Sequence, residues 1–145
     1  MKVITLWQPW ASLIVEGKKH IETRSWKTDY RGLIGIHAAK IPYIPYGLNY
    51  NAILKAQHQE LLDKYRDLPR GEIIGYARLT HCIQITEGFA SVVKRDNPSE
   101  YAFGDYTPGR YAWLLEDIIK LPESILAKGK QRLWNHDIPL IEEGR

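Results

Sequence analysis

The segment from residue 17 to residue 26 gathers side chains that could recognise or transform a polar, planar ligand. It reads Gly-Lys-Lys-His-Ile-Glu-Thr-Arg-Ser-Trp. Successive side chains of an extended chain point to opposite faces, so His20, Glu22, Arg24 and Trp26 are predicted to share one face and Lys19 to lie on the other. An amine, a carboxylate, a guanidinium and an indole this close together suit a nucleotide or a similar ligand. We expect the functional site in this segment.

Aromatic side chains flank the segment on both sides. Trp7 and Trp10 precede it, and Trp26 and Tyr30 follow the charged residues. Stacking of a nucleic-acid base on an aromatic ring contributes about 1–3 kcal/mol. The sequence favours packing in the hydrophobic core for Trp7 and Trp113. For Trp10 and Trp26 it favours a place in the ligand site and a place in the core equally. For the charged residues, plain mutual neutralisation on a strand face is the alternative to ligand binding.

Other common chemistries find no support in the sequence. There is no glycine-rich phosphate loop, no serine nucleophile elbow and no metal-ligand spacing among the five histidines. Neither a metal nor another cofactor is therefore expected. The single Cys82 excludes an internal disulfide, and its apolar surroundings predict a small buried side chain.

Composition indicates one soluble globular domain over residues 1–145. Hydrophobic residues make up 44% and charged residues 26%, and no stretch reaches the roughly 18 apolar residues of a membrane helix. We therefore expect a cytoplasmic protein. The net charge of +3 is uneven, since residues 1–40 carry +4 and the remainder −1. Such a small net charge does not by itself demand a nucleic-acid partner.

The elements that must position the charged segment can be read from apolar periodicity and from Pro and Gly. In the first part of the chain the sequence predicts a strand at 3–7, a helix from Pro9 to its cap at Gly17, a strand at 21–26, a turn at 28–32 and a buried strand at 33–38. A connection at 41–50 and a helix at 52–65 follow.

The second part of the chain reads mainly as strands. The sequence predicts a long strand at 72–85, a mostly irregular region at 87–109 with a short helix at 88–95, strands at 111–115 and 118–122, and a loop or helix start at 129–134. Helices and non-consecutive strands in one small domain favour an α+β fold in which the sheet curls into a small barrel.

At this point the motifs resemble a known family. The resemblance rests on Leu6-Trp7-Gln8-Pro9-Trp10, on the pattern Gly-x-Lys-x-x-Glu-x-Arg from Gly17 to Arg24, and on Ile36-His37-Ala38-Ala39. These residues are similar to the ASCH domain, and most similar to the branch at the C-terminus of the coactivator activating signal cointegrator 1. The closing residues 128–134 match that branch too, so the resemblance covers residues 3 to 135.

The resemblance implies a β-barrel related to the PUA domain, with peripheral helices and a cleft lined by the motif residues. It also implies a role in RNA or other nucleic-acid binding. Some members hydrolyse N4-acetylcytidine or similar small amides, and others are reported ribonucleases. In the amidohydrolase branch a lysine and a threonine are catalytic, with a distant glutamate assisting. Lys19 matches that lysine, but Glu22 replaces the threonine, and the distant glutamate has no obvious counterpart.

The leading hypothesis from the sequence is binding of RNA or another single strand through a cationic, aromatic-lined cleft. Lys19 and Arg24 would contact phosphate or a base edge. Glu22 would orient Arg24 or accept hydrogen bonds from the amino edge of a base. Arg31 and the cluster at 128–132 would extend the basic track. The candidate ligand-binding residues are Gln8, Trp10, Lys19, Glu22, Arg24, Trp26, Tyr30, Arg31, Lys128 and Lys130.

Two other function classes stay open at the level of sequence. The first is a hydrolase acting on a modified nucleoside or small amide, or a ribonuclease, with Lys19 and Glu22 as its catalytic residues. The second is a protein-interaction module that uses its aromatic surface. The sequence does not decide whether the protein is an enzyme, and it identifies no protein partner.

Overall fold

A computed structural model describes residues 1–40 and 67–141. The predicted connection at 41–50 and the predicted helix at 52–65 lie outside the described residues. The elements of the first segment are β1 (Lys2–Leu6), α1 (Trp10–Val15), β2 (Ile21–Arg24) and β3 (Gly32–Ala38). Those of the second segment are β4 (Glu72–Gln84), α4 (Glu87–Asp96), α5 (Pro98–Ala102), β5 (Tyr111–Leu126) and β6 (Leu133–Asn135).

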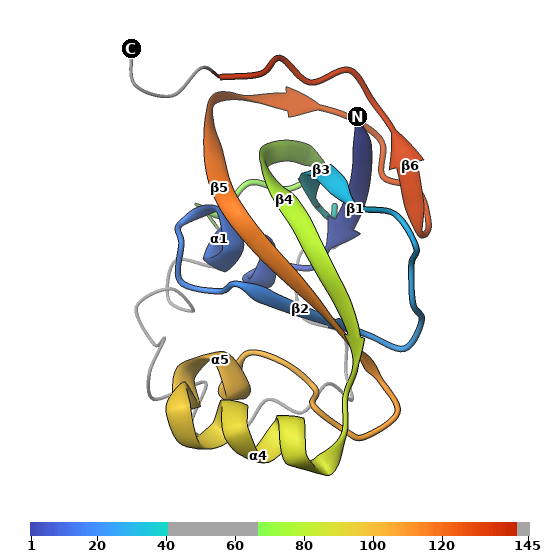
Figure 1. Cartoon of the computed structure of the whole chain (residues 1–145). Coiled ribbons are helices and arrows are strands. Elements are labelled where there is room, and N and C mark those ends of the chain that lie inside the picture. Colours follow the sequence, from blue (N-terminus) through green and yellow to red (C-terminus); the bar gives the residue numbers. More distant parts are fainter. Residues whose placement is uncertain (41–66, 142–145) are drawn as a thin grey trace.

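The strands form one six-stranded sheet in the order β2-β5-β4-β3-β1-β6. Only β1 and β3 are parallel to each other, and the remaining pairs are antiparallel. β4 and β5 are the long strands that cross the front of the molecule in Figure 1, and the pairing between them shifts register at three places. Because such bulges bend a strand and increase its twist, the sheet curls into a half-barrel.

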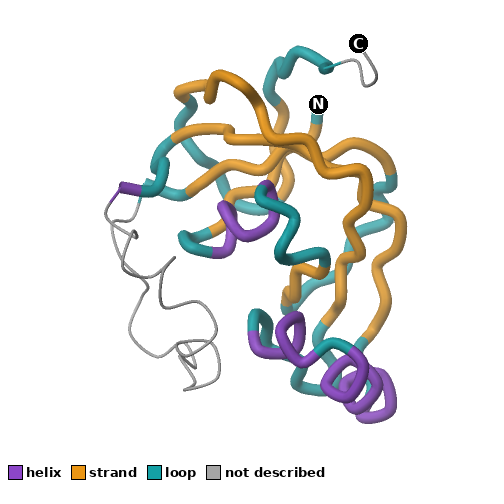
Figure 2. The backbone as a smooth tube through the Cα atoms, turned by 90° about the vertical axis from the view of Figure 1, so that its left-hand side faces the viewer, coloured by secondary structure: helices purple, strands orange, loops and turns teal. Residues whose placement is uncertain are grey.

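Helix α1 lies against the concave side of the curled sheet and completes the main core. Ala11, Ile14 and Val15 of α1 pack with Ile34 and Ile36 of β3. The contact is also close at residue 75 of β4, a glycine, where a Cβ atom would lie only 2.5 Å from the Val15 side chain. Figure 2 shows α1 near the sheet, and α4 and α5 at the lower end of the molecule.

A second apolar cluster covers the other face of the sheet near the N-terminus. Val3, Ile73, Tyr76, Leu121 and Trp134 are all buried in it. The chain after β6 packs here as well, because the Tyr76 hydroxyl accepts a hydrogen bond of 2.7 Å from the backbone N–H of Ile141. Both faces of β1 and β3 are therefore covered, which explains why β3 reads as a continuous apolar run.

The structure confirms most of the predicted elements and corrects some of their limits. β4 confirms the long strand predicted at 72–85. β5 confirms the strands predicted at 111–115 and 118–122, which form one continuous strand that extends to Leu126. The predicted strand at 21–26 ends at Arg24, and residues 129–134 are a loop that enters β6 at Leu133. Cys82, expected to be buried, is half-buried against the main core.

Helix α5 was not predicted, although its start has a recognisable signal. Asn97 caps it by accepting from the backbone N–H of Glu100, and Pro98 occupies the first turn. Thr86 caps α4 in the same way through the N–H of Phe89. Within the described residues, none of the helices is both long enough and apolar enough to cross a membrane.

Candidate functional site

Lys19 is a predicted site residue with no exposed surface. Its amine donates to the backbone carbonyl of Ile21 and, over 3.4 Å, to that of Phe103. Glu22 Oε1 lies 3.7 Å from the amine. Burial lowers the pKa of Lys19 below its ordinary 10.5, and the charges of Glu22 and Glu100 oppose this change. Lys19 therefore joins the start of β2 to the end of α5.

Glu22 and Arg24 extend this buried group toward β1. Arg24 Nε lies 3.2 Å from Glu22 Oε2, and Arg24 Nη2 donates a hydrogen bond of 2.9 Å to the carbonyl oxygen of Thr5. β2 and β1 are not neighbours in the sheet, so Arg24 closes the open side of the half-barrel between them. The side chains of Glu22 and Arg24 are only 12% and 27% exposed.

Glu100 is a member of this group that the sequence did not reveal. It is 2% exposed, and its carboxylate accepts hydrogen bonds from the backbone N–H groups of His20 and Ile21 at 2.7–3.1 Å. The two carboxylates also affect the nearby hydroxyl of Tyr106. Burial raises the pKa of the Tyr106 hydroxyl, and the carboxylates of Glu100 and Glu22 raise it further.

The expected division of the segment into two faces is wrong at Lys19. β2 begins only at Ile21, so Lys19 lies in the preceding turn, where strict alternation does not apply. Its backbone N–H bonds to the carbonyl of Leu13, at the end of α1. The turn directs the lysine inward, and Lys19 and Glu22 meet although they were assigned to opposite faces.

Trp26, Tyr30 and Arg31 lie in and beside the chain between β2 and β3. The ring of Trp26 meets that of Trp113 edge to face at 4.8 Å, and the guanidinium of Arg132 covers it at 4.6 Å. Tyr30 donates to the carbonyl of Leu33, and the exposed Arg31 bonds to local backbone carbonyls. Trp113 is buried in the core, as predicted.

Gln8 and Trp10 attach α1 to the rest of the molecule. Gln8 is fully buried, donates to Ser12 Oγ and to the Pro69 carbonyl at 2.8 Å, and accepts from the Ser12 N–H. The indole N–H of Trp10 donates to the carbonyl of Phe103 at 2.6 Å. Both residues make structural contacts in this arrangement.

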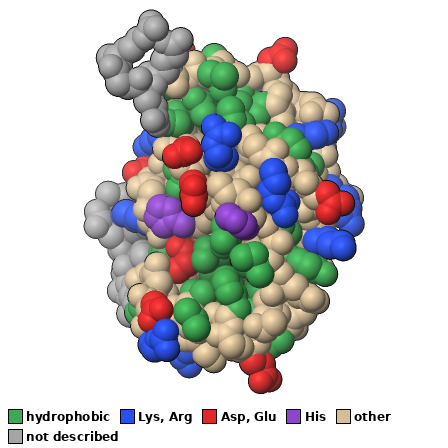
Figure 3. Space-filling model, in the orientation of Figure 1, with side chains coloured by type: hydrophobic (Ala, Val, Ile, Leu, Met, Phe, Trp, Pro, Cys, Tyr) green, Lys and Arg blue, Asp and Glu red, His purple; other side chains and the backbone are tan. Residues whose placement is uncertain are grey.

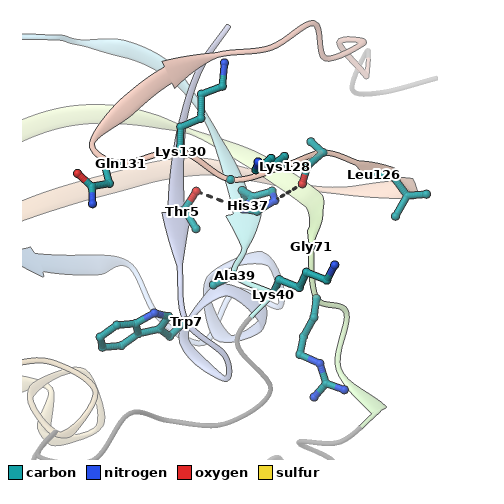
Figure 4. A pocket seen from close by; sticks show the side chains of 13 residues that line it. Thr5, Trp7, His37, Ala39, Lys40, Gly71, Leu126, Lys128, Lys130 and Gln131 are labelled. Atoms are coloured by element: carbon teal, nitrogen blue, oxygen red, sulfur yellow. Dashed lines mark hydrogen bonds between the residues drawn. The ribbon is translucent and has the colours of Figure 1, made fainter.

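Trp7 does not pack in the core as the sequence predicted. Leu6 and Gln8 on either side are buried, and alternation therefore turns Trp7 outward, where it is 38% exposed. It lines a pocket of about 980 Å³ that also includes Thr5 and His37. Figure 4 shows the Trp7 ring at one end of this pocket.

The pocket is strongly basic, and we call it the basic pocket. Its walls come from the ends of β1 and β3, the start of β4 and the loop between β5 and β6, and its cationic residues are Lys40, Arg70, Lys128 and Lys130. None of the lining residues within 1–40 and 67–141 carries a carboxylate. By contrast, acidic and basic side chains are interspersed on the face of the molecule in Figure 3.

The predicted site residues thus separate into neighbouring groups. Lys128 and Lys130 lie at the basic pocket, whereas Lys19, Glu22 and Arg24 form the buried group. The two groups are linked through Thr5, whose backbone binds Arg24 and whose side chain lines the pocket. Sequence reasoning missed Lys40 and Arg70 as pocket residues because they meet Lys128 and Lys130 only in the folded chain.

His37 lies under the pocket, 1% exposed, and is hydrogen-bonded through both ring nitrogens. Nε2 lies 2.7 Å from the carbonyl of Ala127 and Nδ1 lies 3.2 Å from Thr5 Oγ1. Burial lowers the pKa of His37 below its ordinary 6.5, the bond to Ala127 opposes this, and the charge of His136 lowers it slightly further. The folded protein therefore favours neutral His37.

This pKa change predicts a loss of stability in mild acid. The unfolded chain binds a proton at His37 at a higher pH than the folded protein does, so stability is present above pH 6.5 and falls as the pH decreases below it. The contribution is at most about 1.4 kcal/mol per pH unit. Urea unfolding at pH 7.5 and 5.5 measures it, with His37→Gln as the non-titrating control. An equal loss in both proteins would contradict this prediction.

No group of three or more His, Cys, Asp or Glu side chains suited to a metal ion occurs in residues 1–40 and 67–141. The side chains of His37, His81 and His136 each lie within hydrogen-bond distance of another group of the protein.

Comparison with known proteins gives a consistent result. The model of the ASCH domain matches residues 4–123. Activating signal cointegrator 1 of Homo sapiens is 30% identical over 138 residues, and the protein of the same name from Mus musculus is 29% identical. Each match covers 92% of this chain and 22% of the relative, so the chain spans about a fifth of the length of these relatives.

Solved structures show the same fold. The crystal structure of an ASCH protein from Zymomonas mobilis aligns with a TM-score of 0.52 at 22% identity, covering 86% of this chain and 71% of that one. A single-residue variant of that protein aligns with a TM-score of 0.50, also at 22% identity, covering 82% of this chain and 70% of its own.

Proposed function

Because the chain belongs to the ASCH domain family, we propose that it binds nucleic acid in the basic pocket, with single-stranded RNA as its preferred ligand. The observation that carries the proposal is the grouping of Lys40, Lys128 and Lys130, together with Arg70, around one cavity, where the described lining residues include no carboxylate. Phosphate groups are the common anions that such a site attracts. The family resemblance points to the same class of ligand.

An exposed indole beside the cations favours an unpaired base over a duplex. Trp7 lines the same pocket as Lys128 and Lys130 and has 38% of its surface exposed. Bases of a single strand can stack on aromatic rings while the backbone follows a basic groove.

In this proposal the candidate residues of the 17–26 segment hold the backbone next to the pocket in place. Arg24 holds the backbone of Thr5, Glu22 holds Arg24, and Lys19 holds the start of β2. Trp26, with Arg132 over its ring, lies at the far end of the loop that carries Lys128 and Lys130. Arg31 is exposed and available to extend the basic surface.

The geometry gives less support to a hydrolase. A catalytic Lys19 would need access to a substrate, yet it has no exposed surface and its amine is bonded to two backbone carbonyls. Glu22, the second candidate, is held by Arg24 at 3.2 Å. For this reason we propose binding and not turnover.

Binding of a fluorescein-labelled oligouridylate, measured by anisotropy at about 50 and 200 mM salt, tests the proposal. Affinity should fall as salt rises, with a log–log slope of about −0.7 for each phosphate contacted. An affinity independent of salt, or an equal preference for duplex DNA, would overturn the proposal for single-stranded RNA.

Replacing Trp7 tests the stacking contact separately. Trp7→Ala should weaken binding by about 1–3 kcal/mol, or about 5- to 150-fold, and Trp7→Phe should recover part of it. The salt slope should stay unchanged, because no cation is removed. Leu140→Ala, at another exposed apolar residue, serves as the control. Wild-type affinity in Trp7→Ala would place the bases elsewhere.

A further inference from the structure

We propose that His37 is a positioning residue for the basic pocket: its hydrogen bond to Ala127 fixes the loop that carries Lys128 and Lys130 in its ligand-binding place. This inference rests on the proposed function and adds a named residue that sets affinity without touching the ligand. We call residues 127–132, between β5 and β6, the basic loop.

The hydrogen bonds of His37 define one tautomer. A backbone carbonyl only accepts, so the 2.7 Å contact to Ala127 places the proton on Nε2. Nδ1 of the neutral ring is then an acceptor, and Thr5 Oγ1 donates to it over 3.2 Å. The indole N–H of Trp134 donates to the same Thr5 oxygen at 3.1 Å. Trp134, Thr5, His37 and Ala127 thus form one directed chain from β6 across β1 and β3 to the basic loop.

The packing of Gly129 shows how closely the basic loop is seated on this histidine. A Cβ atom at Gly129 would lie 2.8 Å from His37 Cε1 and 3.1 Å from Thr5 Oγ1. The glycine backbone therefore rests on the His37 ring, with no room for a side chain between them. Figure 4 shows the loop passing over His37, with the bond to the loop backbone drawn as a dashed line.

The other end of the basic loop is also held. Arg132 has a positive φ of 59°, an uncommon conformation for a residue with a side chain, and its guanidinium covers Trp26 at 4.6 Å. Between these two anchors Lys128 and Lys130 are exposed at the pocket. A loop ordered before binding loses less conformational entropy when it closes on a ligand, and so the anchors raise affinity.

His37 itself cannot serve as a ligand contact, because only 1% of its surface is exposed. Its influence on binding must therefore pass through the groups that it holds. Of these, the basic loop contributes cations to the pocket, whereas Thr5 contributes only a neutral hydroxyl group, which lies within hydrogen-bond distance of His37 and Trp134. The expected consequence is that His37 and the two lysines act on affinity as one unit.

Three substitutions at His37 separate positioning from packing. The amide N–H of His37→Gln can occupy the place of Nε2–H and bind Ala127, whereas the shorter His37→Asn reaches only toward Thr5, and His37→Leu binds neither. Oligouridylate affinity should stay within about threefold of wild type for Gln and fall about tenfold or more for Asn and Leu. Circular dichroism and urea unfolding measure the stability of each variant, and binding is compared at a temperature at which all variants are folded.

The decisive readout is non-additivity. In a Lys128→Ala and Lys130→Ala background, His37→Asn should weaken binding by no more than about twofold, because the loop no longer carries the cations that it positions. Long-range ¹H–¹⁵N spectra of wild type should show the Nε2–H tautomer. Amide exchange at residues 128–131 should be faster in His37→Asn than in His37→Gln.

The outcomes distinguish this inference from the proposed function. A wild-type protein that fails to bind the oligouridylate overturns the proposed function and the statement about affinity together. A wild-type protein that binds, with a His37→Asn effect that persists in full without the two lysines, overturns the inference alone. An Nδ1–H tautomer in wild type would also overturn the inference alone. Equal amide exchange at residues 128–131 in the His37→Gln and His37→Asn variants would overturn it as well.

Discussion

Lys19→Ala is expected to destabilise the protein by about 3–5 kcal/mol, which is the range for removing one partner from a buried charged group. The substitution removes the donor to the carbonyls of Ile21 and Phe103 and leaves a cavity where a fully buried side chain stood. Glu22 loses the nearby amine and keeps Arg24 and the backbone N–H of Thr23 as partners. Since small domains are stable by about 5–15 kcal/mol, this loss removes a large fraction of the total free energy of unfolding.

Urea unfolding followed by tryptophan fluorescence measures this loss as a shift of the midpoint at constant m-value. Lys18→Ala is the matched control, since it is the adjacent lysine and is exposed. Lys19→Met fills the space but donates no hydrogen bond, so its free energy of unfolding should lie between those of wild type and Lys19→Ala. A Lys19→Ala protein as stable as Lys18→Ala would mean that the amine contributes nothing to the fold and would reopen a catalytic role for Lys19.

Reversing the charge of both lysines of the basic loop is expected to produce the largest loss of RNA binding. Hydrogen bonds to charged groups contribute about 1.5–3 kcal/mol each, so Lys128→Glu with Lys130→Glu should weaken oligouridylate binding by at least about tenfold at low salt. The slope of log affinity against log salt should become shallower by about 1.4 if each lysine contacts one phosphate. Both side chains are exposed, and the stability should change little.

A matched control separates local charge at the pocket from net charge. Lys94→Glu with Arg95→Glu changes the total charge by the same amount on α4, which lies at the opposite end of the molecule from β6 in Figure 1. It should reduce affinity only slightly. Equal losses in the two double variants would show that binding follows overall charge and would remove the basic pocket from the proposal.

The sequence by itself determined the elements whose signals are local. Apolar runs and alternation predicted β1, β3, β4 and β5, and Pro9 and Gly17 marked α1. The family motifs predicted the curled α+β architecture, and the ASCH match and the solved structures confirm it. The local charge cluster at Lys19, Glu22 and Arg24 was also visible, because these residues are adjacent in the chain.

Only the tertiary structure decided which way those charges face. Lys19 turns inward because its backbone is held by Leu13 and its amine by carbonyls from β2 and α5, contacts that join residues up to 84 positions apart. Glu100 enters the same group from α5 for the same reason. Periodicity along the chain carries no information about a partner so distant in sequence.

The basic pocket likewise exists only in the folded chain. Trp7, Lys40, Arg70 and Lys128 come from four separate stretches of sequence, and of these residues the sequence placed only Lys128 among the candidate ligand-binding residues. They meet because β1 lies between β3 and β6, which brings the loop after β5 over the ends of the first strands. Strand order and curl depend on the packing of the whole sheet, and the placement of these cations follows from that packing.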